Sequence, residues 1–288
     1  MNPGPVGVRR AVRPSGQPDT AVKNAEPGFV RFGVLGPVVV MAADGECMPL
    51  PAQKMRILVA ALVTSGGRPL SADHLTDALW NGDPPASAHK NLHQYVHRLR
   101  AHLARCGLTE RLVRGPSGYL LRVYPGELDA DRFHTLAGEG RAARARGELG
   151  SAEHAFADAL SMWRGDALAD VRSSMMLSDA AHGLTESRLG VIEEYVDVEL
   201  RMGHHTLVIP ELAQLVMAHP FRERMREFQM LALYASGRKA DALAAYQECR
   251  LVLARELGID PGPALNAVLA AIMGNDDREL APRLSRSR

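Results

Sequence analysis

One stretch of this chain, residues 84–109, brings together side chains whose types and spacing could do chemistry. It contains no Asp or Glu, and its basic residues are Lys90, Arg98, Arg100, Arg105, His89, His93, His97 and His102. The histidines at 89, 93 and 97 recur every four residues, a helical spacing that can bind a metal ion. No acidic or thiol ligand adjoins them, so we expect no metal. The simpler explanation of a positively charged surface is that it binds a polyanion, and nucleic acid is the first candidate.

A helix predicted from about Ser87 to Arg105 must position these side chains. On a helical wheel its apolar residues lie within about 40° of Leu92, and they therefore form one face that can pack on the protein. That face comprises Ala88, Leu92, Val96, Leu99 and Leu103. The opposite side carries Lys90, Gln94 and His97, flanked by His93 and Arg98.

The outward side chains have the donors that read base edges. Lys and Arg donate to guanine O6 and N7, and Gln can bond adenine with both ends of its amide. The alternative is a solvated polar face, and the pattern leaves open which residue reads a base and which touches phosphate. The predicted DNA-reading residues are Ser87, His89, Lys90, His93, Gln94, His97 and Arg98.

The elements around this helix predict a winged helix. Short β-prone runs between residues 29 and 50, separated by Gly-Pro and Asp-Gly, indicate a small antiparallel sheet. Helices are expected over about 52–65 and after a cap at Ser71, and the breaker Asn-Gly-Asp-Pro-Pro precedes the basic helix. Basic arms around Gly115–Gly118 then predict a hairpin. In this order the third helix enters the major groove, and the hairpin lies over the backbone or minor groove.

Five further basic residues are predicted to contact the DNA backbone. Two start the first helix, whose positive N-terminus attracts phosphate. Three lie on the hairpin, where neutralising phosphates competes with a plain role as solubilising strand-edge charges. These residues are Lys54, Arg56, Arg111, Arg114 and Arg122, with Arg114 nearest the turn.

The charge of the chain is divided between its halves. The formal net charge is only +1, but residues 31–124 hold 11 Lys and Arg against 6 Asp and Glu. From residue 127 onward there are 19 against 25. Such asymmetry indicates nucleic-acid contact through one domain.

The second half predicts helix after helix with an internal repeat. Leu200-Arg201-Met202-Gly203 and Tyr234-Ala235-Ser236-Gly237 lie 34 residues apart, and Gly147 with the residues after it resembles a third copy. A 34-residue period of paired helices is typical of tetratricopeptide units, which stack and usually bind proteins or peptides. Residues 1–28 and 274–288 lack apolar periodicity, and we expect them to be disordered.

Several functions are disfavoured by what the sequence lacks. There is no GxxxxGK[ST], GxSxG or HExxH, so neither catalytic residues nor a cofactor is expected. The 3 cysteines are far apart without CxxC, which suits a reducing cytoplasm. The longest clean apolar run is far shorter than the roughly 20 residues that cross a bilayer, so no membrane partner is expected.

The motifs together resemble one bacterial family. FGVLGPVVV, LTDALWNGDPPASAHKNLHQYVHRLRAHL and GPSGYLL resemble the DNA-binding half of the Streptomyces antibiotic regulatory protein (SARP) family. LSMWRGDALADV and ALYASGRKADALAAYQECRLVLARELGIDPGPAL resemble that family's bacterial transcriptional activation domain. Members commonly show Arg, Gln and Ser at the positions of His89, His93 and His97, which leaves the preferred base sequence open.

The resemblance implies a fold and a function. The fold is mainly α with a small antiparallel β component: an OmpR-type winged helix over 29–124, then a tetratricopeptide-like all-α domain over 125–273. The implied function is pathway-specific activation of a secondary-metabolite (antibiotic) gene cluster. Two protomers, as a homodimer or in tandem, would bind direct repeats in double-stranded DNA and recruit RNA polymerase holoenzyme including its sigma factor. The resemblance assigns polymerase contact to Asn81, Gly82, Asp83 and Pro84.

Two other functions stay open at this point. The repeat half could make the chain a protein-binding adaptor in which the basic helix is incidental. A ligand-responsive repressor with the same DNA module is the second alternative.

Overall fold

The computed structural model describes residues 29–42, 44–172 and 174–276, with residues 278, 280 and 284. The disorder expected for residues 1–28 therefore lies outside the described residues. Of the expected tail, only a few residues beyond 274 are described, and Leu280 among them is buried. The described chain divides into two compact units, one reaching to Ala137 and including Asp158–Arg188, the other comprising Gly138–Ala157 and the chain from Leu189 onward. The domain limits expected at 124 and 273 stay a prediction.

The first unit begins with a three-stranded antiparallel sheet. Its strands are β1 (Phe32–Gly33), β2 (Val39–Met41) and β3 (Cys47–Met48), in the order β1-β2-β3. Phe32 pairs with Val40, and Val40 pairs in turn with Met48. The sheet is short, but Phe32 and Val40 are fully buried, so one of its sides is apolar.

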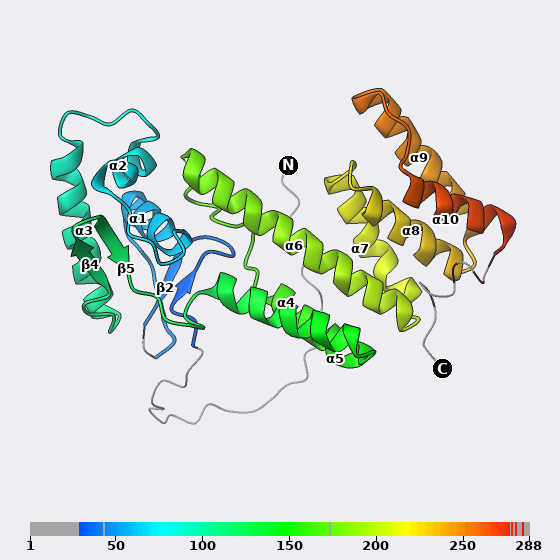
Figure 1. The fold of residues 1–288 in the computed structure, drawn as a ribbon, viewed down its shortest axis with the longest axis horizontal. Helices are drawn as coiled ribbons and strands as arrows, with labels where there is room; N and C mark the ends of the chain where they lie inside the picture. The colour runs from blue at the N-terminus through cyan, green and yellow to red at the C-terminus, as the bar shows by residue number, and fades with distance from the viewer. Residues whose placement is uncertain are drawn as a thin grey trace. The chain divides into compact units, whose positions relative to one another are not determined.

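Three helices follow the sheet: α1 (Gln53–Thr64), α2 (Ala72–Trp80) and α3 (Ala88–Arg105). The Ser71 hydroxyl accepts a hydrogen bond from the His74 amide and caps α2, as its position predicts. Asn81, in the left-handed conformation at φ 54°, ends that helix. α1 is buried on nearly every side, because α2, α3 and the hairpin strand β5 (Gly118–Leu121) all pack on it (Figure 1).

A hairpin closes the winged helix. β4 (Leu112–Gly115) pairs with β5 (Gly118–Leu121) around the two-residue turn Pro116-Ser117. The amide and carbonyl of Tyr119 in β5 both pair with Leu70, which anchors the hairpin to the segment between α1 and α2. Gly118 has φ +126°, and a Cβ there would lie 2.0 Å from the Leu70 oxygen, so this close approach requires glycine.

A buried carboxylate joins later residues to the sheet within this unit. Asp129, at the start of α4 (Asp129–Ala145), accepts hydrogen bonds from the Val34 and Leu35 amides and from Arg164. Burial raises the pKa of Asp129 despite these bonds. Leu128 adds a parallel bridge to Phe32. Residues well beyond the hairpin are therefore part of the same compact unit.

The rest of the described chain is mainly helical, and the same type of glycine turn ends three helices. Its elements are α5 (Leu149–Ser161), α6 (Met175–Arg201), α7 (His205–Ala218), α8 (Glu223–Ala235), α9 (Lys239–Leu257) and α10 (Pro263–Gly274). Gly147, Gly203 and Gly237 have φ between 77° and 85°. At each, the next amide bonds the carbonyl five residues earlier, which closes the helix by the same left-handed cap. The predicted fold class, a winged helix followed by an all-α repeat region, is confirmed.

Candidate nucleic-acid interface

α3 separates its apolar and polar residues as its sequence predicts. Its inner residues Ala88, Leu92, Val96, Leu99 and Leu103 are each at most 3% exposed and face α1 and α2. Full burial of each large aliphatic side chain is worth roughly 1.5–3 kcal/mol, so the helix is held firmly by this face. The outer face is therefore presented on a rigid support.

The outer face gathers five of the predicted reading residues. Lys90, His93, Gln94, His97 and Arg98 are exposed and line one shallow hollow of about 740 Å³ on the helix surface. Lys90 and Arg98 form no ion pair with another described residue. Two positive charges without carboxylate neighbours thus face solvent, which is the electrostatics that attracts a phosphate backbone.

The structure places the other two predicted residues differently. His89 Nε2 lies 3.5 Å from Asp73 Oδ1 of α2, and both side chains are well exposed. Ser87 precedes the first turn of α3, where its hydroxyl accepts a hydrogen bond from Asn91. Neither lines the hollow, so His89 and Ser87 stand apart from the five.

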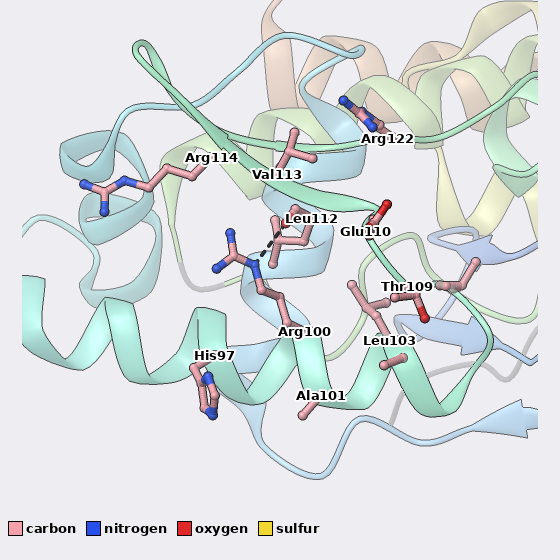
Figure 2. Close-up of a pocket in the computed structure, with 12 residues that line it drawn as sticks. His97, Arg100, Ala101, Leu103, Thr109, Glu110, Leu112, Val113, Arg114 and Arg122 are labelled. Atoms are coloured by element: carbon pink, nitrogen blue, oxygen red, sulfur yellow. Dashed lines mark hydrogen bonds between the residues drawn. The ribbon is translucent and has the colours of Figure 1, made fainter.

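Arg114 and Arg122 extend the positive surface onto the hairpin. Both are exposed, and the guanidinium of Arg114 lies 5.6 Å over the ring of Tyr119 on the facing strand. Arg114 adjoins the turn, as its position predicts. Figure 2 shows it extending outward from the hairpin arm.

Arg100, which was not among the predicted DNA contacts, completes this surface. Arg100 donates its Nε proton to the Leu112 carbonyl at 3.0 Å and so turns from α3 toward β4 (Figure 2). With His97, Arg114 and Arg122 it lines a groove between helix and hairpin whose floor includes Leu103. On the helix it stands between the apolar and polar faces, and its only signal was the absence of acids around it.

Arg111 is engaged inside the first unit. Its guanidinium donates to both carboxylate oxygens of Glu127 at 2.8 Å and lies 4.0 Å over the Tyr124 ring. Burial alone would raise the pKa of Glu127, but hydrogen bonds from Arg111 and the Tyr124 amide, with the charges of Arg111 and Arg31, hold that pKa below its usual value. Arg111 therefore ties the end of the hairpin to the chain that follows.

Lys54 and Arg56 also have partners within this unit. The Lys54 ammonium donates to the Leu79 carbonyl and lies 5.1 Å over the Trp80 ring, and burial lowers its pKa. Arg56 pairs with Asp170 at 2.6 Å. Both contacts hold the scaffold of the winged helix, and a phosphate contact by either residue stays a prediction.

The loop predicted to touch polymerase is exposed. Asn81, Gly82, Asp83 and Pro84 connect α2 to α3, and each has an exposed side chain or backbone. Lys54 at the Leu79 carbonyl and the contact of Trp80 with Tyr95 of α3 hold the start of this loop. Its position in the fold is thus defined, and its partner stays a prediction.

Two family models match the chain. The bacterial transcriptional activator domain matches residues 128–273, and the C-terminal domain of transcriptional regulatory proteins matches residues 45–121. Regulatory protein DnrI of Streptomyces peucetius is 37% identical in a match that covers 86% of this chain and 93% of DnrI. The chain belongs to the SARP family. The resemblance predicted from the sequence motifs is confirmed.

Other relatives of this SARP family member are longer. Regulatory protein AfsR of Streptomyces coelicolor is 40% identical over 90% of this chain, but the match covers 26% of AfsR. The chain thus spans about a quarter of that relative's length. The solved structure of Mycobacterium tuberculosis EmbR in complex with a low affinity phosphopeptide superposes with a TM-score of 0.81 at 35% identity. That match covers 85% of this chain and 65% of EmbR.

Metal-binding clusters and membrane-spanning helices are both absent from the described part of this family member. No group of three or more His, Cys, Asp and Glu side chains there could hold a metal ion. Among the same residues, no helix combines the length and apolarity that crossing a membrane requires.

Proposed function

We propose that this chain is a sequence-specific DNA-binding transcriptional activator. The observation that carries the proposal is the outer face of α3, where Lys90, His93, Gln94, His97 and Arg98 lie together without a carboxylate while the inner face is buried. A rigid helix with such a face fits the major groove of B-DNA. Membership of a family of regulators supports the same conclusion.

Within this proposal the residues divide by role. Lys90, Gln94 and Arg98 carry the donors and acceptors that suit base edges, and His93 and His97 lie between them. Arg100, Arg114 and Arg122 form the second group, beside the hairpin, and suit phosphates or the minor groove. Arg114, nearest the turn, is the first of these to meet the minor groove.

The remaining parts of the proposal concern partners. Two protomers bind direct repeats about one helical turn apart, and the loop Asn81–Pro84 meets RNA polymerase holoenzyme with its sigma factor. The helical repeat unit mediates pairing of the two protomers or regulation. The chain itself has no enzymatic activity. The regulated genes are a secondary-metabolite cluster, as membership of the Streptomyces antibiotic regulatory protein family implies. The protein works in the cytoplasm, at the nucleoid.

DNA binding is tested by gel shift with duplexes that tile the neighbourhood of the gene, repeated with salt raised from about 50 to about 200 mM. We expect one or a few fragments to shift selectively and affinity to fall steeply with salt. Equal binding to all fragments, or none, would contradict a sequence-specific regulator and favour the adaptor.

Activation is tested separately by transcription in vitro from the selected promoter with purified holoenzyme. Added protein should raise the transcript yield, and Asp83→Ala with Asn81→Ala should reduce that gain without changing the gel shift. A lowered yield would identify a repressor instead.

A further inference from the structure

Tyr119 is buried directly behind the residues of the proposed interface. Its side chain is 2% exposed, and its amide and carbonyl each bond Leu70 at 2.8 Å. The neighbouring Gly118 approaches the Leu70 backbone so closely that no side chain fits there. The backbone of Tyr119 is therefore fixed to the segment between α1 and α2, and its ring is buried.

This buried ring contacts both DNA-facing elements. Its hydroxyl lies 2.9 Å from Nδ1 of His93 on α3, and the two ring centroids are 6.4 Å apart. The guanidinium of Arg114 in β4 lies 5.6 Å from the centroid of the same ring. One side chain thus touches an exposed residue of the helix and an exposed residue of the hairpin.

This hydrogen bond also bears on which ring nitrogen of His93 carries the proton. Because a phenol O–H is the stronger donor of the pair and an imidazole nitrogen the stronger acceptor, we assign Tyr119 as the donor and Nδ1 of His93 as the acceptor. A neutral imidazole that accepts at Nδ1 carries its proton on Nε2. His93 then presents an N–H donor on the outer face, beside Lys90 and Gln94. Such a donor matches the major-groove acceptors, which are guanine O6 and N7, adenine N7 and thymine O4, and is repelled by the amino groups of cytosine and adenine.

We propose, on the basis of the DNA-binding function above, that Tyr119 is a positioning residue. It fixes the ring and tautomer of His93 so that His93 selects a hydrogen-bond acceptor in the major groove. Because the same ring supports Arg114, it also sets the helix and the hairpin in one register on the duplex.

The first experiment uses the free protein and needs no DNA. Nitrogen-15 spectra of the imidazoles at alkaline pH, where imidazole is uncharged, distinguish the two tautomers, and His93→Ala assigns the resonance. We expect His93 to be the Nε2–H tautomer in the wild type and a mixture in Tyr119→Phe, which loses only the hydroxyl. Tyr124→Phe, the same change at an exposed tyrosine, should leave the resonance unchanged.

The second experiment measures base preference with duplexes selected from a randomised library. Tyr119→Phe should lower affinity for the best duplex about three- to ten-fold and relax the preference at one base pair. His93→Ala should relax the same position, and the double variant should lose little more, because the two residues act through one contact. The melting temperature of each variant shows that the unit remains folded.

The outcomes separate this inference from the proposed function. Unchanged affinity and preference in Tyr119→Phe, or a uniform loss over all duplexes with an unchanged His93 resonance, would overturn the positioning role. If the wild type selects no sequence from the library, the proposed function fails, while the tautomer spectra still decide whether Tyr119 holds His93. A mixed tautomer in the wild type would overturn the inference even if DNA binding is selective.

Discussion

Paired arginines of the second unit contrast with the unpaired basic residues on the outer face of α3. In the second unit Arg141 and Arg144 share Glu194, Arg201 pairs with Asp197, and Arg222 pairs with Glu193. On the outer face of α3, Lys90 and Arg98 have no such carboxylate among the described residues. The difference teaches that positive charge marks a partner-binding surface only where the fold leaves it unneutralised.

The largest expected effect comes from reversing charge on the unneutralised surface. The variant Lys90→Glu/Arg98→Glu should lower DNA affinity about 100-fold or more, because each lost contact costs about 1–3 kcal/mol and repulsion is added. Anisotropy titrations with the duplex selected by gel shift measure this. The melting temperature should stay nearly constant, since both side chains are exposed.

The matched control is Arg141→Glu in the second unit, at a partly exposed arginine that is paired with Glu194. It should leave DNA affinity unchanged and cost no more than about 1 kcal/mol of stability. Equal losses of DNA affinity in both variants would break the comparison between paired and unpaired charge.

A smaller effect is expected from the hairpin. Arg114→Ala should lower affinity about five- to ten-fold and reduce the slope of log K against log salt by about 0.9, the value for one phosphate contact on B-DNA. Titrations over several salt concentrations measure the slope. An unchanged slope with weakened binding would place Arg114 on a base edge instead of a phosphate.

Arg111 sharpens the comparison because it lies on the hairpin yet belongs with the paired arginines. Glu127→Gln should destabilise the protein by roughly 1–3 kcal/mol at neutral pH, since charge-assisted bonds to Arg111 are lost. The pKa of Glu127 is lowered in the folded state, so its contribution is present above the ordinary pKa of Glu and is lost as pH falls through the folded value. The difference between variant and wild type should therefore disappear in acid.

Chemical unfolding across this pH range measures the prediction. DNA affinity of Glu127→Gln at neutral pH should not fall, because the change removes a negative charge and leaves Arg111 positive. If the stability difference persists below the pKa of Glu, the Arg111–Glu127 pair does not hold the hairpin.

Local patterns predicted much of the fold, and long-range pairings could not be predicted. The two faces of α3, the Ser71 cap and the 34-residue repeat follow from helical periodicity and backbone capping, which depend on neighbouring residues. By contrast, Asp129 bonds amides 94 and 95 residues away. That contact exists only once the tertiary fold has brought the segments together.

The candidate site shows the same limit. The helical wheel identified Lys90, Gln94 and His97 as outward residues, and the structure exposes all three. The helical wheel could not show that Arg100 turns to the Leu112 carbonyl or that Arg111 is held by Glu127. Each depends on where the hairpin crosses the helix, which no local pattern contains.

The smallest expected effect compares two histidines on α3. His102 is buried, and burial followed by the charge of Arg105 lowers its pKa, with partial compensation by the Met48 backbone. As pH falls through the ordinary value for His, the unfolded chain takes up a proton first, so the protein loses stability. Thermal unfolding at about pH 7.5 and about pH 5.5 should show a smaller acid loss in His102→Gln than in the wild type. His97→Gln, at an exposed position, should keep the wild-type loss, and equal behaviour of the two variants would show that burial does not distinguish these histidines.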